Sequence, residues 1–384
     1  MNFWLILYII DWALFIGVAI TTSYMLIFSV ASLFMRHTDI IKAKRHNRFI
    51  ILIPAYQEDK VINQCVISVL SQTYPQRMFD VVVISDHQSE MTNMKLAQYP
   101  ITLLTPNFEK STKAKSLQYA ILNLPEFKIY DAVVVLDADN LVEPEFLEQV
   151  NDAFESAGTK AITTHRLPKN RDTTTARLDA IFEEINTSIF RRGHITLGLS
   201  AAMSGSGVVY DFDWFKQNIM KIRTAEEDKE LEALLMRQRI YVDYFDHIYV
   251  YDEKKRKTGE ISRQRSRWVL AQYKTLIKNI YNLPRAIFSS HYDYTDKIIQ
   301  WILFPRMATV VIILVMCLVL PFIYFTSAIK WWVVGLLLGF AFAFATPNHM
   351  VDDHWDKDFL LLPVRLVVSI GKRILSRFKK NSIN

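Results

Sequence analysis

Cysteine, glycine and proline are all scarce in this chain of 384 residues, which contains 2 cysteines, 10 glycines and 12 prolines. Two cysteines exclude a disulfide scaffold and a metal site built from several thiolates. So little glycine and proline excludes collagen-like and low-complexity sequences. Because Cys65 lies in a helix-like stretch and Cys317 in an apolar run, we expect both thiols to be chemically inert.

Charged residues are also sparse, at 22%, against 51% apolar residues. The mean hydropathy is +0.11, whereas a soluble domain usually lies below zero, so the composition predicts membrane segments. The charges lie mostly in the middle of the chain, which argues against a polytopic transporter. The length leaves room for one large domain and a few membrane spans.

The net charge of +6 comes from two short basic clusters. Residues 36–48 hold five lysines and arginines against Asp39, and residues 371–384 hold five with no acidic residue. Both clusters lie beside apolar stretches, where basic residues bind anionic lipid headgroups. We therefore expect membrane lipids as partners, and no nucleic acid.

Apolar runs long enough to cross a membrane lie at both ends of the chain, a crossing helix taking about 20 residues. Residues 1–35 are predicted to form one transmembrane helix, interrupted by Asp11 and a short polar patch. Residues 300–346 are predicted to form a transmembrane hairpin with Lys330 in its turn. A cleaved signal peptide is the weaker alternative for the first run, because a basic start and a small-residue cleavage site are missing.

The basic cluster after the first run predicts the orientation, since basic residues favour the cytoplasmic side. The N-terminus is then outside, the middle of the chain is cytosolic, and the protein is integral to the plasma membrane. Residues 268–282 and 356–384 mix apolar and basic residues at helical spacing. This pattern predicts amphipathic helices at the membrane interface, the alternative being ordinary core-facing helices.

The middle of the chain, residues 46–285, has the pattern of an α/β domain. Short apolar runs at 49–53, 79–85 and 132–136 alternate with helical stretches. Such alternation is typical of βαβ units and of a parallel, Rossmann-like sheet. Ligands of these sheets bind at the carboxyl ends of the strands.

Polar residues follow each of these predicted strands. The first run ends in Pro54-Ala55-Tyr56-Gln57-Glu58, the second in Ser85-Asp86 and the third in Asp137-Ala138-Asp139-Asn140. The carboxylates of Asp137 and Asp139, two positions apart, can hold a divalent cation together with substrate phosphates. A simple Asx turn is the alternative for the Asp137 pair.

Two further motifs lie closer to the C-terminus. Glu226-Glu227-Asp228 opens a helical stretch, where one carboxylate could act as a general base or the three could merely favour the helix N-terminus. Gln264-Arg265-Ser266-Arg267-Trp268 places an arginine beside a tryptophan. The pair could clamp a diphosphate and stack on a sugar, or could anchor a basic surface to the bilayer.

Taken in this order, the motifs resemble the family 2 glycosyltransferases, in the membrane branch of cellulose, chitin and hyaluronan synthases. The resemblance covers about residues 48–268 and the flanking apolar runs. It implies a GT-A fold, a UDP-sugar donor, and Mg²⁺ or Mn²⁺ as cofactor. It also implies an inverting reaction, which gives a β-linkage from an α-linked donor.

The resemblance implies roles for single residues. Those that would bind the donor are Tyr56, Glu58, Asp86, Lys113, Asp137 and Arg267. Those that would hold the metal are Asp139 and Asp137, and Asp228 would be the general base. Those expected near the acceptor are Gly205, Glu227, Gln264 and Trp268.

Departures from the family pattern leave alternatives open. Gln57 stands where asparagine is usual, His87 is unusual, and Glu226 replaces a threonine or serine. The chain has fewer apolar runs than cellulose or hyaluronan synthases, so a pore would require a second copy of the chain or a secretion partner. The favoured product is a polysaccharide or oligosaccharide; the alternatives are one sugar transfer to a membrane lipid, and a catalytically silent subunit.

Overall fold

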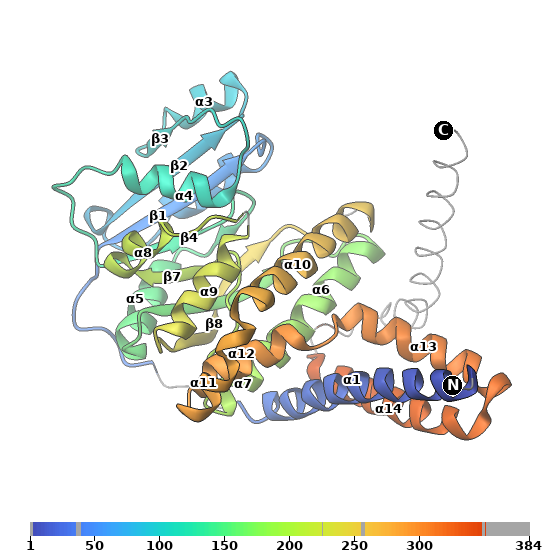
Figure 1. The fold of residues 1–384 in the computed structure, drawn as a ribbon. Coiled ribbons are helices and arrows are strands. Elements are labelled where there is room, and N and C mark those ends of the chain that lie inside the picture. Colours follow the sequence, from blue (N-terminus) through green and yellow to red (C-terminus); the bar gives the residue numbers. More distant parts are fainter. Residues whose placement is uncertain (1–2, 36–39, 225, 255–257, 348–349, 351–384) are drawn as a thin grey trace. The chain divides into compact units, whose positions relative to one another are not determined.

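The structure is a computed structural model that describes residues 3–35, 40–224, 226–254, 258–347 and 350 (Figure 1). For residues 258–265 and 267 it describes the backbone alone. The described chain divides into two compact units. One comprises residues 3–34, 181–189 and 302–350, and the other comprises residues 35–180 and 190–301.

The first unit contains three apolar helices, α1 (Phe3–Ser32), α13 (Arg306–Ile323) and α14 (Phe325–Ala345). Each is long and apolar enough to cross a membrane. Many of their large apolar side chains point outward, as Phe322 does with 92% of its surface exposed. An outward apolar surface suits hydrocarbon rather than water.

Lys330 does not lie in the turn of the hairpin, and this prediction is wrong. The chain turns at Tyr324, where the backbone is extended between α13 and α14. Lys330 instead lies within α14 and forms an ion pair with Asp11 of α1. Asp11 also accepts a hydrogen bond of 2.8 Å from the indole of Trp331. A charge among apolar helices needs such a partner, so the pair explains the position of Lys330 and joins α1 to α14.

The second unit is built on one eight-stranded sheet in the order β3-β2-β1-β4-β7-β6-β8-β5. The strands are β1 (Phe49–Tyr56), β2 (Phe79–Asp86), β3 (Thr102–Leu104), β4 (Ala132–Val135), β5 (Leu141–Val142), β6 (Ala161–Pro168), β7 (Val208–Asp211) and β8 (Val242–Asp252). The α/β class is confirmed. The sheet is mixed rather than parallel, because β7 runs antiparallel to both β4 and β6.

Helices lie in the connections between strands and after the last strand, β8. They are α2 (Ile62–Leu70), α3 (Glu90–Leu96), α4 (Lys113–Leu122), α5 (Phe146–Ala157), α6 (Thr174–Thr187), α7 (Gly193–Thr196), α8 (Phe212–Ile219), α9 (Glu227–Arg237), α10 (Thr258–Asn279), α11 (Leu283–Phe288) and α12 (Tyr292–Ile302). Short 3₁₀ turns lie at Gln76–Met78 and Ile280–Asn282, and a π-helical turn lies at Ser188–Arg192.

Both faces of the sheet are covered at its centre, which explains why β1, β2 and β4 contain continuous apolar runs. Alternate side chains of a strand face opposite ways. Ile50 and Leu52 therefore pack into a core with side chains of α4, α8 and α9. Phe49 and Ile51 pack into a second core with side chains of α2 and α5. The ends of these strands, where the polar motifs follow, are therefore where a ligand can be expected.

The two predicted interface helices differ in how far the structure describes them. The first falls on α10, where Leu270 and Ile277 are exposed while Thr275 and Asn279 are buried. An exposed apolar face is what an interface helix requires, but contact with a membrane stays a prediction. The second, residues 356–384, lies outside the described residues.

Candidate active site

Tyr56 and Asp86 end two neighbouring parallel strands, so they lie side by side at the carboxyl edge of the sheet. The next residues, Gln57 and His87, both have φ values in the left-handed region, +54° and +57°. The chain turns away at both points and leaves Tyr56 half exposed. Glu58 follows in the same turn, and its carbonyl accepts the amides that open α2.

The Asp86 carboxylate is buried, with 1% of its side chain exposed. Its Oδ1 lies 2.5 Å from Nδ1 of His87. Its Oδ2 is also buried, and no described residue donates to it. A buried acceptor without a donor calls for an explanation. A donor group of a bound ligand would complete it, and the family resemblance implies that Asp86 binds the nucleotide of the donor.

Asp137 begins the turn that follows β4, and two side chains hold its backbone there. The Asp137 amide donates to Oγ of Ser206 at 2.8 Å and to Oδ1 of Asn140 at 3.2 Å. Asn140 also donates to Oδ1 of Asp139 at 3.2 Å. These bonds hold a tight polar turn, and the carboxylates of Asp137 and Asp139 stay partly exposed.

Lys113 brings together residues that are far apart in the sequence. Its Nζ forms an ion pair with Asp137 and donates to the carbonyl of Gly205 at 2.6 Å. It also lies 3.6 Å from Oε1 of Glu227. The structure therefore joins four of the predicted site residues around one ammonium group. Asp228 follows Glu227 in the first turn of α9 and is half-buried.

Burial sets the charge state of this cluster. It raises the pKa of Glu227 to about 8, although Lys113 acts against it, and the neighbouring Asp228 raises it further. Burial also opposes the charge of Lys113, but Asp137 and Glu227 outweigh it and raise the pKa of that ammonium. At neutral pH the lysine is charged, while Glu227 holds a proton for much of the time.

The loop from Ser200 to Gly207 carries Gly205 to this cluster. Gly207 closes the loop with a φ of +68°. A Cβ on Gly207 would lie 2.5 Å from Oγ1 of Thr164, so only glycine fits. Gly205 has open space around it and contributes its carbonyl.

The oxygen ligands at Asp137 and Asp139 fit Mg²⁺ or Mn²⁺. Within the described residues there is no group of three or more His, Cys, Asp and Glu that could hold a metal. Hard cations of this kind are often held by two carboxylates, with substrate phosphates supplying the remaining ligands. Asp137 and Asp139 therefore suit a cation that arrives with its substrate.

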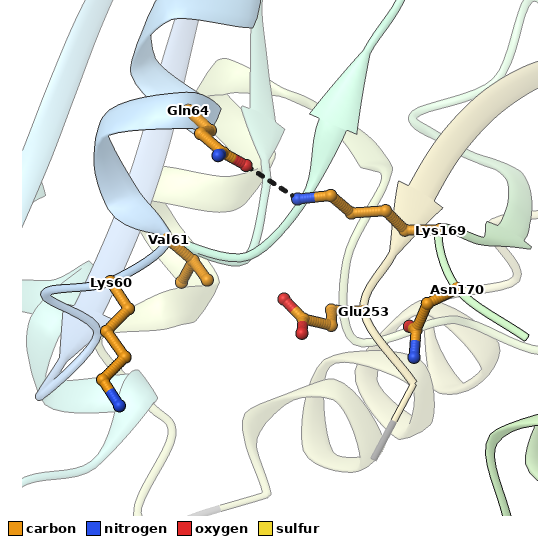
Figure 2. A pocket seen from close by; sticks show the side chains of 6 residues that line it. All are labelled: Lys60, Val61, Gln64, Lys169, Asn170 and Glu253. Atoms are coloured by element: carbon orange, nitrogen blue, oxygen red, sulfur yellow. Dashed lines mark hydrogen bonds between the residues drawn. The ribbon is translucent and has the colours of Figure 1, made fainter. Parts of the chain in front are cut away.

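An open pocket of about 430 Å³ lies at the same carboxyl edge, where β6 and β8 end and α2 begins (Figure 2). Lys60 and Val61 line one side, and Glu253 points its carboxylate toward the middle. Lys169 crosses the pocket and donates to Gln64 at 2.9 Å. The sequence motifs give no indication of this pocket, because its residues come from three separate segments.

The structure leaves the last motif incomplete. Gln264 and Arg267 lie in α10, but their side chains are outside the described residues. Trp268, in the same helix, has 43% of its surface exposed. Positions three and four apart share one face of a helix, so Gln264 shares a face with Arg267 and Trp268.

Comparison with known proteins supports this interpretation of the fold. The sequence model of the family described as "Glycosyltransferase like family 2" matches residues 46–271. A similar solved structure is the mannosyltransferase PcManGT of Pyrobaculum calidifontis, in complex with GDP-Man and Mn²⁺. The two chains are 12% identical with a TM-score of 0.52, over 94% of this chain and 98% of that one.

A fragment of S. aureus TarS, residues 1–349 in complex with UDP-GlcNAc, is a more distant match. It is 16% identical with a TM-score of 0.39, over 55% of this chain and 59% of that one. No curated protein sequence matches the chain. At these identities the likeness to PcManGT shows the fold, which is GT-A.

Proposed function

The chain belongs to the glycosyltransferase-like family 2, and from this membership we propose that it is an inverting membrane enzyme that transfers a sugar from a UDP-sugar to a growing glycan. One observation carries the proposal: Lys113, Asp137 and Glu227 meet at the carboxyl edge of the sheet. A lysine beside the candidate metal ligand Asp137 suits a donor that carries a diphosphate.

In the proposed mechanism, Tyr56, Glu58 and Asp86 bind the nucleotide. Asp137 and Asp139 hold Mg²⁺ or Mn²⁺, which when bound would neutralise charge on the diphosphate. Lys113 lies against Asp137 and adds a second positive charge at this point.

The motif on α10 completes the proposed site. Arg267 binds the diphosphate, while Trp268 stacks on the acceptor sugar with Gln264 nearby. The loop that carries Gly205 lies beside this acceptor.

Asp228 is the proposed general base. It takes the proton of an acceptor hydroxyl as the oxygen bonds to the anomeric carbon and the bond to the diphosphate breaks. Because attack and departure occur on opposite sides, the configuration inverts. Glu227, with its pKa near 8, keeps a proton in much of the population and leaves the base role to its neighbour.

The acceptor we favour is the growing glycan itself, with one transfer to a membrane lipid as the second candidate. The exposed apolar surfaces of α1, α13 and α14 support an integral membrane location. We propose that the catalytic domain faces the cytosol and the N-terminus lies outside. With three candidate spans in the described chain, export of a polymer would require a second copy or a secretion partner.

The test uses the purified full-length chain in lipid, with Mg²⁺ or Mn²⁺ and a panel of UDP-sugars that also includes GDP-mannose. Nucleotide release is followed and the products are sized by mass spectrometry. Several additions from one UDP-sugar would support the polymerase, and a single addition to lipid would favour the second candidate. Release from GDP-mannose alone would overturn the uridine assignment, and no release from any donor would contradict the proposal.

The matched variant is Asp228→Asn. We expect it to lower turnover by about 10²–10⁴-fold, the usual contribution of a general base, while nucleotide binding measured by calorimetry is unchanged. Glu226→Gln, which removes one negative charge two residues earlier, is the control and should stay within a few-fold of the wild type. An unchanged rate in Asp228→Asn would exclude this residue as the base.

A further inference from the structure

A fully buried ion pair joins α12 to α9, away from the residues assigned above. Nζ of Lys297 lies 3.0 Å from Oε1 of Glu232, and their side chains are only 2% and 1% exposed. Removing two charges from water is costly, and a buried pair need not stabilise the fold. The structure tolerates this pair because each member has further polar partners.

The Glu232 carboxylate joins three segments of the chain. It accepts the Met203 amide at 2.8 Å, it accepts Lys297 of α12, and it lies 3.6 Å from Lys229 of α9 itself. Burial opposes its charge, but Lys229 and Lys297 outweigh it and lower the pKa of Glu232 to about 2. Glu232 is therefore a fixed negative charge with donors on three sides.

The Met203 amide, which donates to Glu232, belongs to the loop from Ser200 to Gly207 that reaches the active site. Two residues after Met203, the carbonyl of Gly205 accepts from Lys113 at 2.6 Å. One residue later, Oγ of Ser206 accepts the Asp137 amide at 2.8 Å. The same short loop is thus held by Glu232 at one end and by the Asp137 turn at the other.

Helix α12 holds this loop at a second point and also orients Lys297. Asp293 accepts the amide of Ser200 at 2.6 Å. Gln300 accepts from Lys297 at 3.0 Å and donates to Asp296 at 2.6 Å. The side chain of Lys297 is thereby fixed from two sides.

We propose that Lys297 and Glu232 are positioning residues that hold the loop from Ser200 to Gly207, and the first turn of α9, in the geometry needed for sugar transfer. Three residues separate the end of α12 from the start of α13, a candidate membrane span. The pair thus makes the catalytic geometry depend on the helix that leads into the apolar hairpin. This inference rests on the proposed function.

The test compares Lys297→Met with the wild-type full-length chain in lipid. We expect kcat for transfer to fall about tenfold or more, with the KM of the donor within twofold, because strands β1 and β2 are untouched. Hydrogen exchange should rise in the peptide covering 199–207 and stay unchanged in β1 and β2. The control is Lys278→Met, which breaks a more exposed 3.0 Å pair with Glu230 between α10 and α9; its kcat should change less than twofold.

A double variant separates positioning from simple stability. Lys297→Met combined with Glu232→Gln removes both buried charges, so its thermal midpoint should recover while kcat stays low. Recovery of kcat together with the midpoint, or an unchanged kcat in Lys297→Met, would overturn the positioning role. An inactive wild-type chain would instead contradict the proposed function, and the hydrogen exchange would still test how the loop is held.

Discussion

The two units place apolar and charged side chains in opposite ways. In the helical unit, apolar side chains such as Phe322 and Leu336 face outward, and Asp11 and Lys330 pair inside. In the α/β unit the apolar side chains form the core, while buried ionisable groups such as Glu227 gather beside the candidate active site. A buried pair that only joins helices should affect stability, whereas buried charge beside the site should affect chemistry.

The two cysteines allow this comparison to be tested, because each unit holds one. Cys317 lies in α13, and Cys65 is fully buried in α2 under the Asp137 turn, with its Sγ 3.6 Å from the Asp137 carbonyl. Burial raises the pKa of the Cys65 thiol, so it reacts slowly until the unit unfolds. Maleimide labelling during heating, read by mass spectrometry, reports the two units separately.

The largest effect is expected from Asp139→Asn, in the α/β unit. Loss of this proposed metal ligand should lower kcat/KM about 1,000-fold, since metal stabilisation of charge amounts to several kcal/mol. The labelling midpoints of both cysteines should not move, because Asp139 is partly exposed. Full activity in the variant, with the same metal requirement, would contradict the assignment.

Asp11→Leu should have the next largest effect, and in the helical unit alone. The change leaves Lys330 buried without its carboxylate, which costs about 3 kcal/mol, so Cys317 should label at a lower temperature. Cys65 labelling and the turnover of the folded protein should not change. Asp11→Leu combined with Lys330→Leu is the control and should recover most of the loss. A matching shift at Cys65 would show that the units do not respond separately.

The smallest effect is a pH dependence in the α/β unit. The pKa of Glu227 is raised from 4.5 to about 8 in the fold, so between these values the folded state keeps a proton that the unfolded state has released. The contribution of Glu227 to stability is therefore fully present below about pH 4.5 and is lost as the pH rises toward 8.

Glu227→Gln cannot release this proton, so the variant should lose less stability than the wild type between pH 5 and pH 8. The measurement is the labelling midpoint of Cys65 in both proteins at each pH. Glu226→Gln, at a partly exposed position in the same turn, should follow the wild type. If the curves for Glu227→Gln and the wild type run parallel, the raised pKa is wrong.

Local patterns in the sequence predicted much of the framework. The apolar runs predicted the candidate spans, because length and hydropathy are properties of a single segment. The strand ends at Tyr56 and Asp86, and the end of β4 at Val135 just before Asp137, followed from short apolar runs that stop at polar residues. Parallel pairing of β1 with β2 and β4 then brings these ends to one edge.

The wrong predictions concern features that depend on contacts between distant segments. Lys330 looked like a turn residue, because its partner Asp11 lies 319 residues away. The antiparallel β7 was not foreseen, because strand direction depends on how the chain returns to the sheet. The pocket at Lys60, Lys169 and Glu253 was missed for the same reason.

The sequence by itself determined the candidate spans, the α/β class, and which polar residues stand at the strand ends. Only the tertiary structure decided that Lys113 joins Asp137 to Glu227, and that Lys297 reaches Glu232. The physical reason is the distance along the chain over which each effect acts. Hydropathy and periodicity act over one element, whereas the charge state of a buried carboxylate depends on segments that come together only when the chain has folded.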